Sequence, residues 1–236
     1  MARKIKLQTQ IRSQERETRP VRIRKYKMYI LIVCEDTKTE PAYFESFKKL
    51  FPKETVFLRS IGTGKDPLGV VEQTVKERET LKENMLKEID QVWSVFDIDD
   101  ANENETKRSK FQDALTKAKT ENIRLAYSNE VFELWLLLHL TGVSSENPIS
   151  RQAIYVELQS QIRKHKEYEN YEYDHHRIDP LFLSIIEEKG DEKRAITRAK
   201  QLEEVHQGKE PLLANPSTKV HLLVQELRDW IDYYNY

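Results

Sequence analysis

The feature that most constrains the fold is MYILIVC, residues 28–34, a continuous apolar run that leads straight into acidic residues. A short run of this kind is typical of a strand covered on both faces, as in a parallel sheet. Further strands are predicted at 55–61, 91–100 and 122–128, with helical patterns between them. Strands that alternate with helices indicate βαβ units and an α/β fold.

The rest of the chain is predicted to be helical. Pro41 suits a first helical turn, and Asp66 and Pro67 begin a long helix that runs to about residue 89. The other helices are expected at 106–120, 130–140, 151–168, 180–189, 192–207 and 217–234. No strand is expected after about residue 150. The predicted organisation is a basic N-terminal arm (1–27), an α/β core (28–142) and a helical C-terminal region (143–236).

The composition of the chain bears on its cellular location and its binding partners. Cys34 is the only cysteine, which rules out an internal disulfide and fits a reducing compartment. No apolar window is long enough to span a membrane, and the N-terminus has no secretory pattern, so a cytoplasmic location and no membrane partner are expected. The net charge is only −1, yet residues 1–27 are rich in Lys and Arg. Arg22 and Arg24 in this arm are predicted to contact nucleic-acid phosphates. A solvated tail, or a strap across acidic surface, is the alternative.

Acidic residues follow two of the predicted strands. Glu35 comes after the first strand, and Asp97 and Asp99 come at the end of the third. The carboxyl ends of parallel strands share one edge, where ligands bind, so these carboxylates are expected to converge. Asp97 and Asp99 would point the same way if the chain stayed extended. Clustered carboxylates repel one another, so they bind either protons or a divalent cation such as Mg²⁺. The alternative, that loop acids cap helices or turns, is favoured for residues 99–100 taken alone.

Glu133 lies in the stretch 130–140, which is apolar nearly all round and therefore predicted to be buried. A buried carboxylate needs a cation, an arginine or a proton. Glu130 is expected in the first helical turn, where the helix dipole favours an acid. His139 is interpreted as a core histidine.

Four segments taken in order resemble the RloB family of bacterial defence proteins and, more loosely, Toprim nuclease domains of the OLD type. They are CEDTKTEPAYF, VFDIDD, SNEVFELWLLLH and NPSTKV. The resemblance implies a Toprim-like parallel-sheet core and phosphoryl transfer that depends on Mg²⁺ or Mn²⁺. It implies catalytic roles for Glu35, Asp97 and Asp99, with Glu40 and Glu133 as additional metal ligands. The family usually has Gly where this chain has Asp36, and Pro where it has Glu130.

The predicted function is a metal-dependent endonuclease that cleaves RNA, tRNA included, or DNA in anti-phage or abortive-infection defence. Lys65 and Lys219 are further candidates for phosphate contacts, against a solvated loop lysine and a residue beside a helix cap. An ABC-type ATPase and a second copy of the chain are the protein partners considered. The alternative function is a catalytically silent effector or binding subunit of such an ATPase complex. A topoisomerase or primase core ranks last, because the chain is short for one.

Overall fold

The apolar run that opens the predicted core forms β1, a strand inside the sheet with every residue buried. The computed structural model describes residues 26–175 and 180–236. The strands in the described residues are β1 (Met28–Cys34), β2 (Val56–Gly62), β3 (Gln91–Asp97), β4 (Arg124–Asn129) and β5 (Ser217–Thr218). The helices there are α1 (Thr39–Glu45), α2 (Pro67–Met85), α3 (Glu105–Thr120), α4 (Glu133–Leu140), α5 (Arg151–Arg163), α6 (Pro180–Lys189), α7 (Glu192–Val205) and α8 (Val220–Asn235).

The strands pair in the order β2-β1-β3-β4-β5. The pairs among β2, β1, β3 and β4 are parallel, and β5 pairs antiparallel with β4. In this register Cys34 lies opposite both Gly62 and Val95, and Asp97 lies opposite Ser128. The predicted α/β class with a mainly parallel sheet and flanking helices is confirmed, and the arrangement is consistent with a Toprim-like core.

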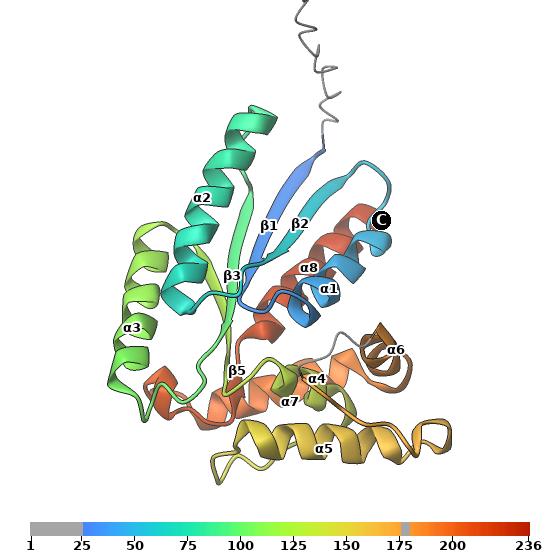
Figure 1. Ribbon diagram of the computed structural model, residues 1–236. Coiled ribbons are helices and arrows are strands. Elements are labelled where there is room, and N and C mark those ends of the chain that lie inside the picture. The colour runs from blue at the N-terminus through green and yellow to red at the C-terminus, as the bar shows by residue number, and fades with distance from the viewer. Residues whose placement is uncertain (1–25, 176–179) are drawn as a thin grey trace, which may run out of the picture.

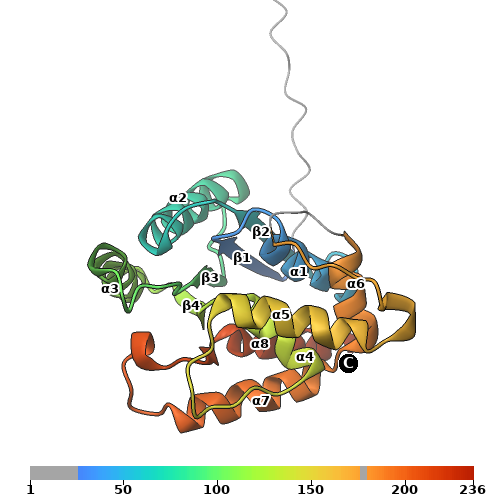
Figure 2. The same ribbon diagram turned by 60° about the horizontal axis from the view of Figure 1, so that its bottom comes forward.

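Alternation along β1 divides the core between the two faces of the sheet. Leu31 and Val33 pack with the apolar residues of α2 and α3. Ile30 and Ile32 pack on the opposite face with residues from α1, α4 and α8. Figures 1 and 2 show these helix layers on either side of the sheet. Both faces of the strand are therefore covered, which is why the run carries no polar residue.

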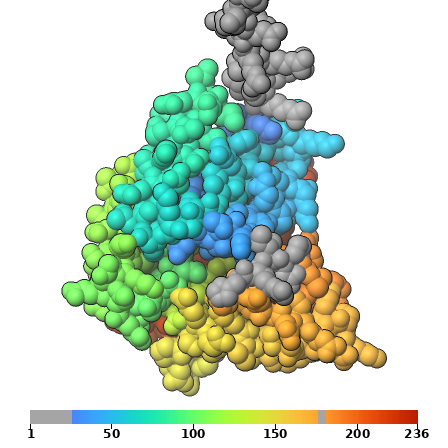
Figure 3. Space-filling view, viewed as in Figure 1, coloured from blue at the N-terminus to red at the C-terminus, as the bar shows by residue number. Residues whose placement is uncertain are grey.

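The C-terminal helices gather around α4 at the carboxyl edge of the sheet. α5, α6 and α7 all contact α4, whose residues 134–138 are completely buried. Figure 1 shows α5 crossing beneath the ends of the strands, and Figure 3 shows it on the surface below the core. The carboxyl edge of the sheet is therefore covered by helices of the C-terminal region.

Two expectations for the chain were wrong. A strand does occur after residue 150, because β5 pairs its Ser217 and Thr218 with β4, and α8 begins only at Val220. The Thr218 hydroxyl also lies 2.8 Å from the Ser128 hydroxyl in the buried interior. The stretch predicted as a helix from residue 130 begins its helix at Glu133. The division at residues 142 and 143 stays a prediction, although the C-terminal region supplies this edge strand.

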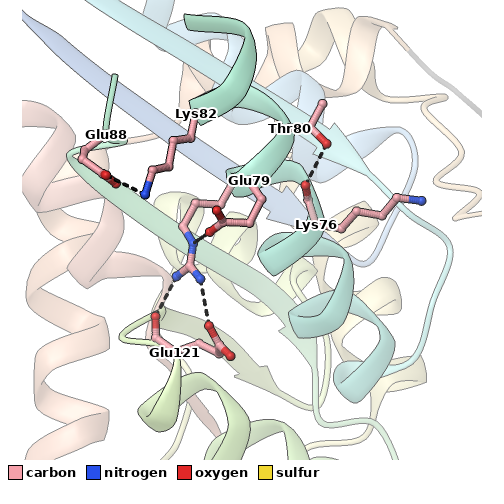
Figure 4. A network of polar contacts seen from close by, with 7 residues as sticks. Lys76, Glu79, Thr80, Lys82, Glu88 and Glu121 are labelled. Atoms are coloured by element: carbon pink, nitrogen blue, oxygen red, sulfur yellow. Dashed lines mark hydrogen bonds and ion pairs between the residues drawn. The ribbon is translucent and has the colours of Figure 1, made fainter. Parts of the chain in front are cut away.

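At the opposite edge of the sheet, an arginine of α2 links this helix to the residue that follows α3. Arg78 donates to the main-chain oxygen of Glu121 at 2.7 Å and to its carboxylate at 2.8 Å. Glu79 accepts another bond from the same guanidinium, and Figure 4 shows these contacts. Within residues 26–175 and 180–236, no helix has both the length and the apolar character needed to cross a membrane.

Candidate functional site: acidic residues at the carboxyl edge of the sheet

The ends of β1 and β3 meet through Glu35. Its main-chain N–H donates to the Val95 oxygen at 2.9 Å, which extends the parallel ladder by one residue. Its carboxylate accepts a bond of 3.1 Å from the main-chain N–H of Asp97. The Glu35 carbonyl accepts from the N–H of Gly64 at 2.7 Å, so the loop after β2 fixes the same residue from the other side. The structure therefore brings together the first pair of residues predicted for the site.

Glu40 joins this group from the second position of α1, where it is 1% exposed. Its carboxylate accepts from the main-chain N–H of Asp36 at 3.1 Å. Asp36 directs its own carboxylate to the N–H groups of Lys38 and Thr39 at the start of α1. The Asp36 carboxylate thus stabilises a helix start.

Asp97 has an oxygen with no hydrogen-bond partner. Oδ1 is buried, and no described residue donates to it. Burial raises the pKa of Asp97 well above its ordinary value, and the negative charges of Glu40, Glu35 and Glu133 raise it further. A buried carboxylate oxygen without a donor is costly unless a proton or a cation reaches it.

Glu35 and Glu40 have raised pKa values for the same reason. Burial raises the pKa of Glu35 to about 7, with the charges of Asp99 and Asp66 adding to the effect. The pKa of Glu40 lies well above its ordinary value, because of burial first and the charge of Glu35 second. These carboxyl groups lie close to one another, so the negative charge of one disfavours the ionisation of the others.

Glu133 has a donor that the sequence did not reveal. The Tyr173 hydroxyl donates to its carboxylate at 2.5 Å. Burial raises the pKa of Glu133, and this hydrogen bond lowers it in part. Glu133 begins α4 at an end where the dipole favours an acid. Its negative charge raises the pKa values of Asp97 and Glu40. Glu133 therefore belongs with Glu35, Glu40 and Asp97 to one acidic group.

Asp99 departs from the expected arrangement. Its φ is 54°, a left-handed conformation, and its N–H donates to the carbonyl of Glu130 at 3.0 Å. The chain is therefore no longer extended after Asp97, and the expectation that Asp97 and Asp99 point the same way does not hold. The Asp99 carboxylate contacts the Arg151 guanidinium through one oxygen, and Lys107 Nζ lies 3.6 Å from the other.

Glu130 also differs from its expected role. It precedes α4, and its carboxylate accepts from the main-chain N–H of Arg151 at 2.8 Å. It thus holds the first residue of α5 close to the turn that carries Asp99. The expectation of a first-turn acid was wrong because the helix begins three residues later.

The residues fit a divalent cation in part. Asp97 offers a buried oxygen without a donor, and Glu35 and Glu40 lie close enough to raise its pKa. Carboxylate oxygens are the ligands that Mg²⁺ and Mn²⁺ prefer. In the described part of the chain, however, no three side chains of His, Cys, Asp or Glu are grouped tightly enough to hold a metal ion. Asp99, whose partners are cationic side chains, fits least well.

The lysines predicted to contact phosphate lie in different places. Lys65 follows β2 and contacts the Gln73 side chain at 3.2 Å. Lys219 pairs with Glu203 and lines a cavity of about 420 Å³ that contains none of the acidic group. Arg22 and Arg24 lie outside the described residues.

Arg151, Lys107 and Tyr173 were not identified from the sequence. Arg151 and Tyr173 reach their acidic partners from positions 52 and 40 residues away along the chain, and Lys107 reaches Asp99 from the next helix; no spacing rule connects these pairs. The only sequence signal was the presence of buried or clustered acids that needed partners.

No curated protein and no solved structure gives a significant match to the chain. The family model described as RloB-like protein matches residues 30–227. That range covers β1 from its third residue onward, β2 to β5, every acidic residue of the site and the first half of α8. The chain therefore belongs to the RloB-like protein family.

Proposed function

We propose that this protein is an endonuclease that depends on Mg²⁺ or Mn²⁺ and hydrolyses phosphodiester bonds of RNA or DNA. The observation that carries the proposal is the junction of Glu35 with Asp97 beside the donor-free oxygen Asp97 Oδ1. This junction places acids from two strands at the edge where ligands of parallel sheets bind. Membership of the RloB-like family is in keeping with it.

In this proposal, Glu35, Asp97 and Glu40 hold the cation, and Glu133 supports them with its carboxylate fixed by Tyr173. The bound metal would supply a hydroxide nucleophile and stabilise negative charge at phosphorus. Without metal, the pKa of Glu35 is about 7, so it would release a proton near neutral pH when it binds the cation. The main-chain bond from Asp97 keeps its carboxylate oriented while it does so.

The resemblance to Toprim nucleases and to bacterial defence proteins supplies the biological setting. We propose that the cleavage acts against phage infection or causes abortive infection, with tRNA among the RNA substrates. An ABC-type ATPase is the proposed partner, and the cytoplasm is the proposed location.

A second function has its own support. The described residues contain no group of three potential ligands arranged for a metal ion, and Asp99 is held by Arg151 and Lys107. A protein of this kind could act as a silent effector subunit that binds an ATPase and cleaves nothing. In that case neither Mg²⁺ nor Mn²⁺ would change its stability.

The test uses purified protein, mixed RNA and mixed DNA, and either Mg²⁺ or Mn²⁺. Wild-type protein is expected to cleave one of the two nucleic acids, and Glu35→Ala is expected to abolish cleavage while its melting curve stays cooperative. Glu45→Ala is the matched control, since Glu45 is an exposed acid of α1 that pairs with Lys48. Undiminished cleavage by Glu35→Ala would refute the proposal. A wild-type protein that neither cleaves nor gains thermal stability with metal would favour the silent subunit.

A further inference from the structure

Two cationic side chains, one from α3 and one from α5, converge on Asp99 at the rim of the acidic group. The Arg151 side chain is 44% exposed and the Lys107 side chain is 46% exposed, whereas that of Asp99 is 27% exposed. All three are therefore accessible from solvent. The neighbouring oxygen Asp97 Oδ1, by contrast, is buried.

Resting on the proposed function, we infer that Arg151 and Lys107 bind a backbone phosphate of the nucleic-acid strand, and that Asp99 positions them instead of binding metal. This assignment differs from the metal-ligand role that the resemblance to Toprim nuclease domains implies for Asp99. It also gives this site cations for phosphate contacts, a role that the sequence predicted for Lys65, Lys219 and the N-terminal arm.

The first argument concerns the Asp99 carboxylate. Both of its oxygens already face cations, one the guanidinium of Arg151 and the other the ammonium of Lys107, whose closer partner is the neighbouring Asp100. The left-handed turn at Asp99 and the bond from its N–H to the Glu130 carbonyl direct it away from the line of β3. An outward carboxylate held in this way orients cations well and is poorly placed to share a buried metal with Asp97.

The second argument concerns the Arg151 guanidinium. It has five N–H donors in a planar fork, and one of its nitrogens donates to Asp99. Among the described residues, no other hydrogen-bond acceptor contacts the guanidinium, so its remaining donors can reach an oxyanion. Glu130 anchors the Arg151 main chain at 2.8 Å, and Ser150 caps α5 by accepting from Ala153 at 3.3 Å. The base of the side chain is therefore fixed while its end stays accessible.

The third argument is electrostatic. Several carboxylates lie at this edge of the sheet. They would repel the phosphodiester of a nucleic-acid strand unless nearby cations offset their negative charge. Arg151 and Lys107 are partly exposed cations beside Asp99, and they supply that positive charge. Arginine is well suited to phosphate oxygens because it can donate two parallel bonds.

A purely structural ion pair is the competing explanation, in which Arg151 and Asp99 only tie α5 to the end of β3. The two explanations differ in binding. A structural pair affects the melting temperature, whereas a phosphate contact affects affinity for nucleic acid and its dependence on salt.

The experiment measures binding of short fluorescein-labelled single-stranded RNA and DNA by anisotropy, in EDTA, across a salt series. Arg151→Gln and Lys107→Gln are each expected to weaken binding about tenfold and to reduce the salt slope by about 0.7. Arg151→Lys should keep the wild-type slope. Lys117→Gln is the matched control, because Lys117 is a lysine of α3 that is 39% exposed and 3.5 Å from Glu72.

A parallel measurement separates the role of Asp99 from that of Asp97. The rise in melting temperature with Mn²⁺ should persist in Asp99→Asn and disappear in Asp97→Asn. The inference is overturned if Asp99→Asn loses the Mn²⁺ effect as fully as Asp97→Asn does. It is also overturned if the Arg151 and Lys107 variants bind like Lys117→Gln. A wild-type protein that binds nucleic acid in this way but never cleaves it would refute the nuclease and leave the phosphate contact standing.

Discussion

The carboxylate of Glu35 accepts a hydrogen bond of 3.1 Å from the main-chain N–H of Asp97, 62 positions further along the chain. The donor belongs to the backbone of β3, so its position is set by the sheet register and does not depend on a rotamer. This bond joins the ends of two neighbouring strands and points an acid of one strand at the acid of the next. The proposed metal site depends on this junction.

Glu35 should make the stability of the protein depend on pH. Its pKa is about 7 in the folded state against an ordinary value of 4.5, so the folded protein holds a proton that the unfolded chain has released between these values. Its contribution to the free energy of unfolding therefore falls as pH rises through this window and levels off above it. Glu35→Gln should lose this dependence and exceed wild type by up to about 3 kcal/mol at about pH 8. Urea unfolding at several pH values measures the difference, and parallel curves for the two proteins would contradict it.

Metal binding should depend on pH in the opposite direction. Glu40 and Asp97 have raised pKa values, so a cation that binds them must displace protons, and its affinity should increase as pH rises. The rise in melting temperature with Mn²⁺ should be larger at about pH 8 than at about pH 6, and EDTA should reverse it. A rise of equal size at both pH values would show that the cation binds elsewhere.

Gly62 should be essential to the geometry of the site. A Cβ at this position would lie 2.3 Å from the Asp36 carbonyl oxygen and 2.3 Å from Thr37 Cα, so the backbone after Glu35 would have to move. Gly62→Ala is expected to lower the melting temperature and to abolish the Mn²⁺ effect. Gly142→Ala is the control, because its Cβ would come no closer than 3.9 Å to another residue, at Arg198. A Gly62→Ala protein with wild-type metal response would show that the loop after β1 does not shape the site.

Tyr173 should stabilise the charged form of Glu133. Tyr173→Phe removes the 2.5 Å bond to that buried carboxylate, and the pKa of Glu133 should rise further. The variant is expected to lose about 1–3 kcal/mol at about pH 8 and less at about pH 5, because the raised pKa of Glu133 favours its protonated form as pH falls.

Chemical denaturation at the two pH values tests this expectation. Tyr168→Phe is the matched control, since its hydroxyl makes a 3.0 Å bond to Glu188 on the surface. A loss for Tyr173→Phe that is the same at both pH values would indicate lost packing and no effect on the Glu133 charge.

The sequence by itself determined the sheet and the placement of its acids. The run of residues 28–34 could only be covered on both faces, and the parallel rule then placed Glu35 and Asp97 at one edge. Both inferences depend on local patterns, apolar continuity and the position of a residue after a strand, and such patterns are visible without coordinates.

Only the tertiary structure decided which groups the acids meet. The contacts of Asp99 with Arg151 and of Glu133 with Tyr173 arise because α5 and the segment after it pack across the carboxyl edge of the sheet. The turn at Asp99 and the pairing of β5 with β4 likewise depend on partners far along the chain. Periodicity reports which face of an element is buried, but it carries no information on which distant residue will lie against it, because that choice is made by packing.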